Sequence, residues 1–172
     1  MFEKIQNRLI EYRDLLELTL ETLQNHIYTA SIIIEETIKN NKKIYFFGDG
    51  KNSVIAQYIS LNCGENLSSN SAILTEIASE YNFDKIYEKQ IEQKVKSGDL
   101  LIGISTSGNN KRVLRGLSIG KTLGCKTIGF SGHDGGVMSE FCDINIVIPS
   151  EDSISINEMH MLISNMIFRN LV

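Results

Sequence analysis

The apolar positions of this chain change their spacing at about residue 42. Over the first 40 residues they recur every three or four positions, which is the period of one face of an α-helix. Asn25 is placed to cap a second helix, so the pattern predicts an N-terminal pair of helices over residues 1–40. The two stripes are Ile5, Leu9, Tyr12, Leu16, Leu20 and Leu23, then Ile27, Ala30, Ile34 and Ile38.

After residue 42, short apolar runs alternate with helical patterns. The runs predict strands at residues 44–47, 100–104, 127–130 and 144–148, with a shorter fifth run at 72–74. Helical patterns occupy residues 52–63, 84–96, 109–123 and 153–171. Such alternation is typical of a parallel sheet covered on both faces. We therefore expect an α/β fold with a five-stranded parallel sheet sandwiched by helices. The single domain would span residues 1–172, with helices at 1–40, the core at 42–150 and a closing helix at 151–172.

The composition excludes several classes of function. Of 172 residues, 42% are apolar and 22% are charged, which suits one folded domain. The net charge is -4 and no basic stripe is present, so nucleic-acid binding is not expected. No apolar run is long enough to predict a membrane span. Residues 1–4 lack the basic head and apolar block of a signal peptide.

The cysteines and histidines do not form a metal-binding pattern. The three cysteines contain no CxxC pair, so we expect reduced thiols and a cytoplasmic location. The three histidines are far apart and lack HExxH-type spacing, so a metal site built from histidines alone is not expected. These residues are Cys63, Cys125, Cys142, His26, His133 and His160.

Two loops rich in small polar residues follow predicted strands. Residues 48–53 read Gly-Asp-Gly-Lys-Asn-Ser, and residues 105–110 read Ser-Thr-Ser-Gly-Asn-Asn. Each leads into a predicted helix, and ligands of an open parallel sheet bind beyond the carboxyl ends of its strands. Exposed N–H groups and the helix dipole favour an anion there, so a phosphate ester is the natural ligand. For each loop alone, a glycine-rich turn with N-capping side chains is the alternative.

The segment from Gly103 to Asn109 resembles the phosphate loop of sugar isomerase (SIS) domains, and most closely that of the phosphoheptose isomerases. Further matches in the same order are residues 48–50, 98–101, 134–136, 148–150 and 157–160. The resemblance implies a flavodoxin-like parallel sheet, and a homotetramer with the N-terminal helices at its centre. It also implies an aldose–ketose isomerisation, in which sedoheptulose 7-phosphate becomes a mannoheptose 7-phosphate through an enediol.

The resemblance places side chains without acid–base capacity at the positions of the family's catalytic residues. Asn62 stands where the family has its base, a glutamate, and Asn165 where it has its acid, a histidine. Tyr58 and Asn157 replace a histidine and a glutamine that some members use, with those two, to bind zinc. An amide cannot take up a proton near pH 7, and these four side chains are poor zinc ligands. We therefore expect neither zinc nor another cofactor.

The resemblance also implies a set of substrate-binding residues. Residues 105–107 match the phosphate loop, while Asn52 and Asn110 replace serines. Asp49 replaces an asparagine and brings a carboxylate close to the phosphate, which should weaken anion binding unless Lys51 offsets it. The full set is Asp49, Asn52, Ser53, Tyr58, Asn62, Glu80, Ser105, Thr106, Ser107, Asn110, Asn157 and Asn165.

Three other side chains are candidates for replacement catalysts. Glu65 lies about one turn beyond Asn62 and would serve if the helix register shifted. Glu158 lies seven residues before Asn165, which puts both on one face of a helix. His160 also lies on that predicted helix, where we expect a buried structural histidine with a hydrogen-bond partner.

Two classes of function stay open at this point. The first is a phosphosugar isomerase. The second is a non-catalytic SIS tetramer that acts as a sugar-phosphate sensor or binds a protein. The replication-initiator-associating protein of bacteria is a SIS tetramer of the second kind, and its last helix resembles residues 158–162 followed by Asn165. A mixed tetramer, in which an intact homologue supplies the missing groups, is a further alternative.

Overall fold

Five parallel strands form one sheet, in the order β2-β1-β3-β4-β5. This computed structural model describes residues 1–68 and 70–169. The strands are β1 (Ile44–Gly48), β2 (Glu65–Asn66), β3 (Leu100–Ile104), β4 (Lys126–Gly132) and β5 (Ile144–Ile148). The parallel five-stranded sheet confirms the predicted fold class, and its strand order is that of the flavodoxin-like folds.

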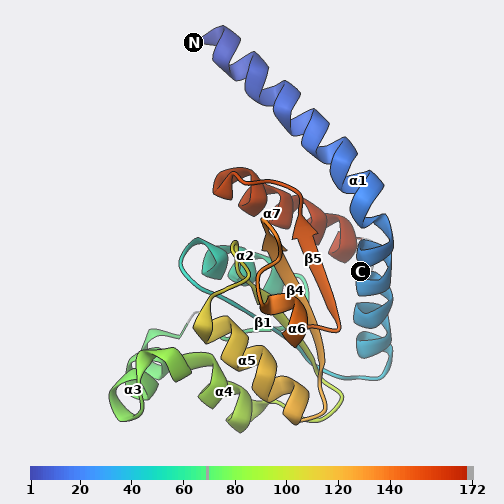
Figure 1. The fold of residues 1–172 in the computed structure, drawn as a ribbon. Coiled ribbons are helices and arrows are strands. Elements are labelled where there is room, and N and C mark those ends of the chain that lie inside the picture. The colour runs from blue at the N-terminus through green and yellow to red at the C-terminus, as the bar shows by residue number, and fades with distance from the viewer. Residues whose placement is uncertain (69, 170–172) are drawn as a thin grey trace.

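Helices cover both faces of the sheet (Figure 1). They are α1 (Phe2–Lys39), α2 (Lys51–Ser60), α3 (Ser71–Glu80), the short 3-10 turn η1 (Phe83–Lys85), α4 (Ile86–Lys94), α5 (Lys111–Thr122), α6 (Met138–Phe141) and α7 (Ser153–Arg169). Alternate strand residues point to opposite faces. Ile102 and Ile128 belong to the core under α1, α2 and α7, whereas Leu101 and Phe47 belong to the core under α3, α4, α5 and α6.

The N-terminal segment is one long helix, so the prediction of a helical pair was wrong. Helix α1 runs without a break through Asn25, which is exposed on its surface. The apolar stripe continues across Asn25 from Leu23 to Ala30, and both of these side chains are buried. An Asn side chain costs little at an exposed helical position, so packing overrides the local capping signal. The N-terminal half of α1 projects beyond the body of the molecule (Figure 1).

The fifth strand is not residues 72–74, as the sequence predicted, but β2. Ala72, Ile73 and Leu74 lie in helix α3, whose N-terminus is capped by Asn70. The Asn70 side chain accepts a hydrogen bond from the Ile73 N–H at 3.1 Å. Strand β2 has only two residues, and both are polar, so it carries no apolar run that a sequence pattern can detect.

The remaining elements lie near their predicted positions with shifted ends. Helix α2 ends at Ser60 rather than residue 63, and the helix predicted at 84–96 divides into η1 and α4. The short helix α6 was not predicted. The closing helix is described as far as Arg169, so the last residues of the predicted helix, 170–172, lie outside the described residues. Within the described residues, no helix is both long and apolar enough to cross a membrane.

Candidate functional site

The two polar loops meet at the carboxyl edge of the sheet, between β1 and β3. These strands pair directly, and Gly48 and Ile104 are partners at the end of the register. The chain continues from β1 to β2 on one side and from β3 to β4 on the other. The loops therefore leave the sheet at its topological switch point, where open α/β sheets bind ligands.

The first loop is anchored through the backbone of Gly48. The Ser68 hydroxyl donates to the Gly48 carbonyl at 3.0 Å, and the Tyr87 hydroxyl donates to the same oxygen. Burial raises the pKa of Tyr87 to about 12, so the phenol keeps the proton that it donates. Gly50 then takes a positive φ of 57° and is the N-cap residue of helix α2. The Ser53 hydroxyl donates back to the Gly50 carbonyl at 2.7 Å.

The second loop is held by backbone contacts with the segment after β4. Gly108 has a φ of 67°, which favours glycine. Its carbonyl accepts from the Met138 N–H at 3.0 Å. Asn109 Oδ1 accepts from the Val137 N–H at 3.1 Å. Asn110 caps helix α5, because its Oδ1 accepts from the backbone N–H groups of residues 112 and 113. The loop is thus fixed at both ends.

Thr106 connects this loop to helices α2 and α7. Its hydroxyl lies 2.8 Å from Asn157 Oδ1 and 3.2 Å from Asn52 Oδ1. A hydroxyl has one proton to donate, so a ligand oxygen that accepted it would free both amides for new contacts. Asn157 also lines a pocket of about 380 Å³ between α2 and α7. The pocket is lined by Lys51, Val54, Ile55, Ile154, Asn157, Glu158 and Met161.

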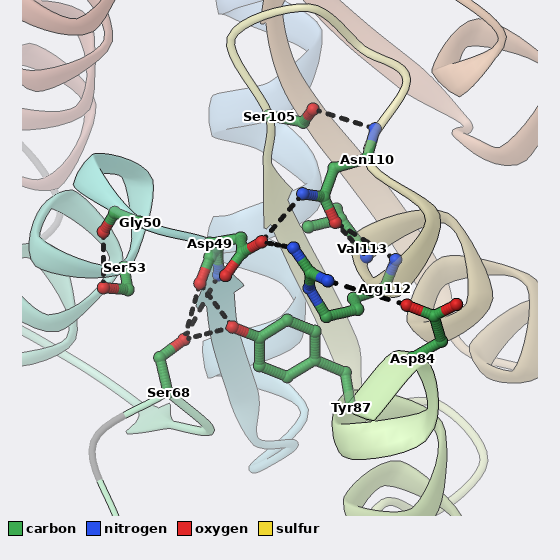
Figure 2. A network of polar contacts seen from close by, with 11 residues as sticks. Asp49, Gly50, Ser53, Ser68, Asp84, Tyr87, Ser105, Asn110, Arg112 and Val113 are labelled. Atoms are coloured by element: carbon green, nitrogen blue, oxygen red, sulfur yellow. Dashed lines mark hydrogen bonds and ion pairs between the residues drawn. The ribbon is translucent and has the colours of Figure 1, made fainter. Parts of the chain in front are cut away.

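An ion pair that the sequence did not reveal joins the first loop to the start of helix α5 (Figure 2). Asp49, after β1, accepts from Arg112 on α5 and from Asn110 Nδ2, the latter at 2.9 Å. Burial opposes ionisation of Asp49, but the hydrogen bonds from Arg112 and Asn110 outweigh it and hold its pKa below the ordinary value. The cation that offsets Asp49 is therefore Arg112, and not Lys51 as the sequence suggested.

Several other candidate residues lie away from this cluster. Glu65 was considered as a displaced base, but it lies in β2 and pairs with Tyr45 near the start of β1. Its carboxylate bonds Lys43 at 2.7 Å, at the amino edge of the sheet. Because helix α2 ends at Ser60, no register shift brings Glu65 toward the loops. Glu80 ends α3 and is exposed.

The implied acid–base positions lie further along α2 and α7. Tyr58, on α2, is 46% exposed, and Asn62 is exposed in the turn after α2. Asn165, on α7, is half-buried. Glu158 lines the pocket, while Ser107 is exposed on the phosphate loop and its Oγ accepts from the Asn109 N–H at 3.3 Å. The structure thus gathers Asp49, Asn52, Ser105, Thr106, Asn110 and Asn157 around the two loops.

His160 is a core residue and does not reach the pocket. It is fully buried, and its ring packs edge-on against Phe130. Its Nε2 lies 2.9 Å from the Ser131 carbonyl oxygen. A carbonyl only accepts, so Nε2 carries the proton. Burial, which outweighs this hydrogen bond, lowers the pKa of His160 to about 4.

The burial of His160 predicts a loss of stability in mild acid. An unfolded histidine titrates near pH 6.5, so between pH 6.5 and 4 the unfolded chain binds more protons than the folded one. Stability should therefore fall as the pH falls through this range, by about 3 kcal/mol in total. Urea unfolding at pH 7 and pH 4.5 measures the change. His160→Gln should flatten it, whereas His26→Gln, on the exposed face of α1, should not. If the stability of His160→Gln keeps the pH dependence of wild type, His160 is not the cause of the loss.

The strand order, together with a polar site at the switch point, defines the class of protein. Residues 9–132 match the SIS domain family, and the chain belongs to that family. Within it, this chain is similar to phosphoheptose isomerases. The enzyme of Nitratiruptor sp. is 40% identical over 97% of this chain and 96% of its own length. That of Aliarcobacter butzleri is 38% identical over 97% of this chain and 95% of its own length. The chain is thus a homologue of the phosphoheptose isomerases, which confirms the resemblance.

A solved structure agrees with this assignment of the fold. The phosphoheptose isomerase of Neisseria gonorrhoeae superposes with a TM-score of 0.93, covering 98% of this chain and 97% of that one, at 24% identity. The side chains at the four positions that the resemblance implies for zinc differ from those of a zinc site. Tyr58, Asn62, Asn157 and Asn165 offer a phenol and three amides, whereas zinc prefers histidine, cysteine or carboxylate. Within residues 1–68 and 70–169, no three His, Cys, Asp or Glu side chains are grouped so that they could hold a metal ion.

Proposed function

We propose that this chain binds a phosphorylated sugar at the carboxyl edge of the sheet. The phosphate would bind at residues 105–110, and the sugar would extend into the pocket between α2 and α7. The observation that carries this proposal is the position of Thr106, whose hydroxyl joins the phosphate loop to Asn52 on α2 and Asn157 on α7. One ligand oxygen at Thr106 would therefore contact all three elements.

The electrostatics of the two loops support an anionic ligand. Helices α2 and α5 both begin at this edge, and their N-terminal ends carry partial positive charge. Lys51 lines the pocket and adds a full positive charge. Hydroxyl and amide donors surround the same point, as expected for a site that holds a phosphate by hydrogen bonds.

We further propose that the chain on its own binds the sugar phosphate without isomerising it. An aldose–ketose isomerisation needs a group that removes a carbon-bound proton, and the implied position of that group is Asn62. No zinc ion would compensate, because the four implied ligand positions hold poor zinc ligands. The protein would then act as a sugar-phosphate sensor or as a partner of another protein.

One observation favours isomerase activity as the second candidate function. Among the described residues that line the pocket, Glu158 is the one carboxylate, and it lies next to Asn157. A glutamate at this place is a possible replacement for the absent base, since carboxylates serve as general bases in such reactions. The two candidates agree on the ligand and differ only in turnover.

An NMR time course with sedoheptulose 7-phosphate, with and without zinc, distinguishes these functions. We expect the sugar-phosphate signals to broaden on binding and no mannoheptose 7-phosphate to appear. Thr106→Val should reduce the broadening, because it removes one partly buried hydroxyl without changing the side-chain shape. Thr122→Val is the matched control, since Thr122 is exposed near the far end of α5. Product signals would establish isomerase activity, and unchanged signals throughout would contradict the site.

For the assembly, we propose a homotetramer in the cytoplasm. Helix α1 carries a series of exposed apolar side chains, which a soluble monomer would leave in contact with water. Self-association would cover them. The three free thiols are consistent with a reducing compartment. The exposed apolar residues on α1 are Phe2, Ile5, Leu9, Ile10, Leu16, Leu18, Leu20, Tyr28 and Ile38.

A further inference from the structure

The carboxylate of Asp49 occupies the donors at the start of helix α5 (Figure 2). One of its oxygens accepts from Asn110 Nδ2 and from the guanidinium of Arg112. Asn110 is the last residue of the phosphate loop, and Arg112 is the second residue of α5. The N-terminus of a helix favours an anion, so Asp49 already supplies a negative charge at the place where a ligand phosphate would bring another.

The side chain of Asn110 uses its oxygen and one of its two N–H donors while Asp49 is bound. Its Oδ1 accepts from the Arg112 N–H at 3.1 Å and from the Val113 N–H at 3.3 Å. Its Nδ2 donates to Asp49 at 2.9 Å. The cap on α5 is a structural requirement of the helix, so the Nδ2 group is the part that can change partners. Asn110 directs both of its Nδ2 N–H groups to a ligand only when it releases Asp49.

Arg112 has more donors than its present contacts use. Its Nη1 lies 3.6 Å from Asp84, and its guanidinium stacks over the Phe83 ring at 4.9 Å. Its Nε is buried and makes no hydrogen bond within the described residues. A guanidinium has five N–H donors arranged to bind a phosphate through two of them at once. Arg112 is therefore held near the loop by two carboxylates and an aromatic ring, and it keeps N–H donors that could bind a phosphate.

We propose that Asp49 and the phosphate of the ligand compete for Arg112 and Asn110, and that Arg112 becomes the phosphate-binding cation when Asp49 is displaced. This inference rests on the proposed function, since it assumes a phosphate at residues 105–110. The competition gives a specificity-determining role to Asp49, in the first loop, and Arg112, at the start of helix α5. A phosphate monoester, which carries up to two negative charges, displaces a carboxylate from an arginine better than a singly charged sugar acid does. The pair therefore selects phosphate monoesters over sugar carboxylates.

Calorimetric titration with inorganic phosphate and with sedoheptulose 7-phosphate tests the competition. Asp49→Asn keeps the shape of the side chain and removes the competing charge, so it should tighten phosphate binding by about 10-fold or more. Arg112→Gln should weaken it by about 10-fold or more, because a charge-assisted contact is lost. Asp84→Asn is the matched control. It removes the same charge from the same guanidinium without freeing Asn110, so its gain should stay below about 3-fold.

The results separate this inference from the proposed function. If wild type binds and Asp49→Asn binds no more tightly, or Asp84→Asn gains as much, the competition is overturned while the phosphate site stands. If no variant binds either compound, the proposed function fails, and the inference fails with it. If Asp49→Asn does not fold, the NMR signals of the wild-type protein provide an independent test. The Nε–H signal of Arg112 should shift when phosphate is added, and a signal that does not move while phosphate binds would overturn the exchange.

Discussion

Gly108→Ala should lower the affinity for a sugar phosphate by about 10- to 100-fold, since each lost hydrogen bond to a charged group costs about 1.5–3 kcal/mol. An alanine Cβ at this position would lie 2.0 Å from the Gly135 carbonyl oxygen and 2.6 Å from its carbon. Both atoms belong to the backbone, so no rotation of a side chain relieves the clash. The positive φ of Gly108 adds strain for any residue with a Cβ. The phosphate loop must therefore move away from the segment after β4.

Gly50→Ala provides the matched control for this variant. Gly50 has a similar positive φ of 57°, but no atom lies within 4 Å of an added Cβ. Its ψ of −122° lies outside the left-handed helical region, so an alanine there adds backbone strain but no clash that displaces the loop. Calorimetry with sedoheptulose 7-phosphate, after circular dichroism has shown both variants folded, measures the difference. Equal affinity in Gly108→Ala and wild type would mean that residues 105–110 do not hold the phosphate.

The parts of the fold that the sequence predicts are those with a strong local signal. The runs at 44–47 and 100–104 are continuous and apolar because both faces of these strands are buried. Strand β2 has two polar residues, so its position depends on tertiary pairing with β1 and not on its own pattern. The run at 72–74 is apolar because it is part of helix α3. On one face of that helix, Leu74 and Ile77 pack against the core. A three-residue window does not distinguish these cases.

The loops of the site were predictable, but their long-range contacts were not. Ser105 and Asn110 follow β3, and any parallel strand delivers its next residues to the same edge of the sheet. Asp49 and Arg112 are 63 residues apart, and no spacing rule connects them. Glu65 was misplaced for a related reason. Its proposed role as a base assumed that helix α2 continues past residue 62, whereas α2 ends at Ser60. Gly64 has a φ of 112° and packs closely against the Ile44 carbonyl.

The double variant Asn62→Glu with Asn165→His should confer isomerase activity on sedoheptulose 7-phosphate. Helices α2 and α7 both start at the carboxyl edge and pack side by side on one face of the sheet. Ile55 and Met161 line the same pocket. Asn165 lies one turn beyond Met161, and Asn62 lies about two turns beyond Ile55. Neither position is buried, so the larger side chains fit without overpacking. Supplying a base and an acid should raise turnover by about 10²- to 10⁴-fold over wild type.

The control for this gain is Asn62→Gln with Asn165→His. Glutamine has the shape of glutamate but cannot remove a proton, so this variant should stay at the wild-type rate. NMR detection of mannoheptose 7-phosphate, with binding checked by line broadening in the same samples, separates chemistry from affinity. A double variant that binds the sugar phosphate but forms no product would contradict the positions assigned to the base and the acid. A wild-type rate already equal to that of the double variant would instead move the search for the base to Glu158, the carboxylate that lines the pocket.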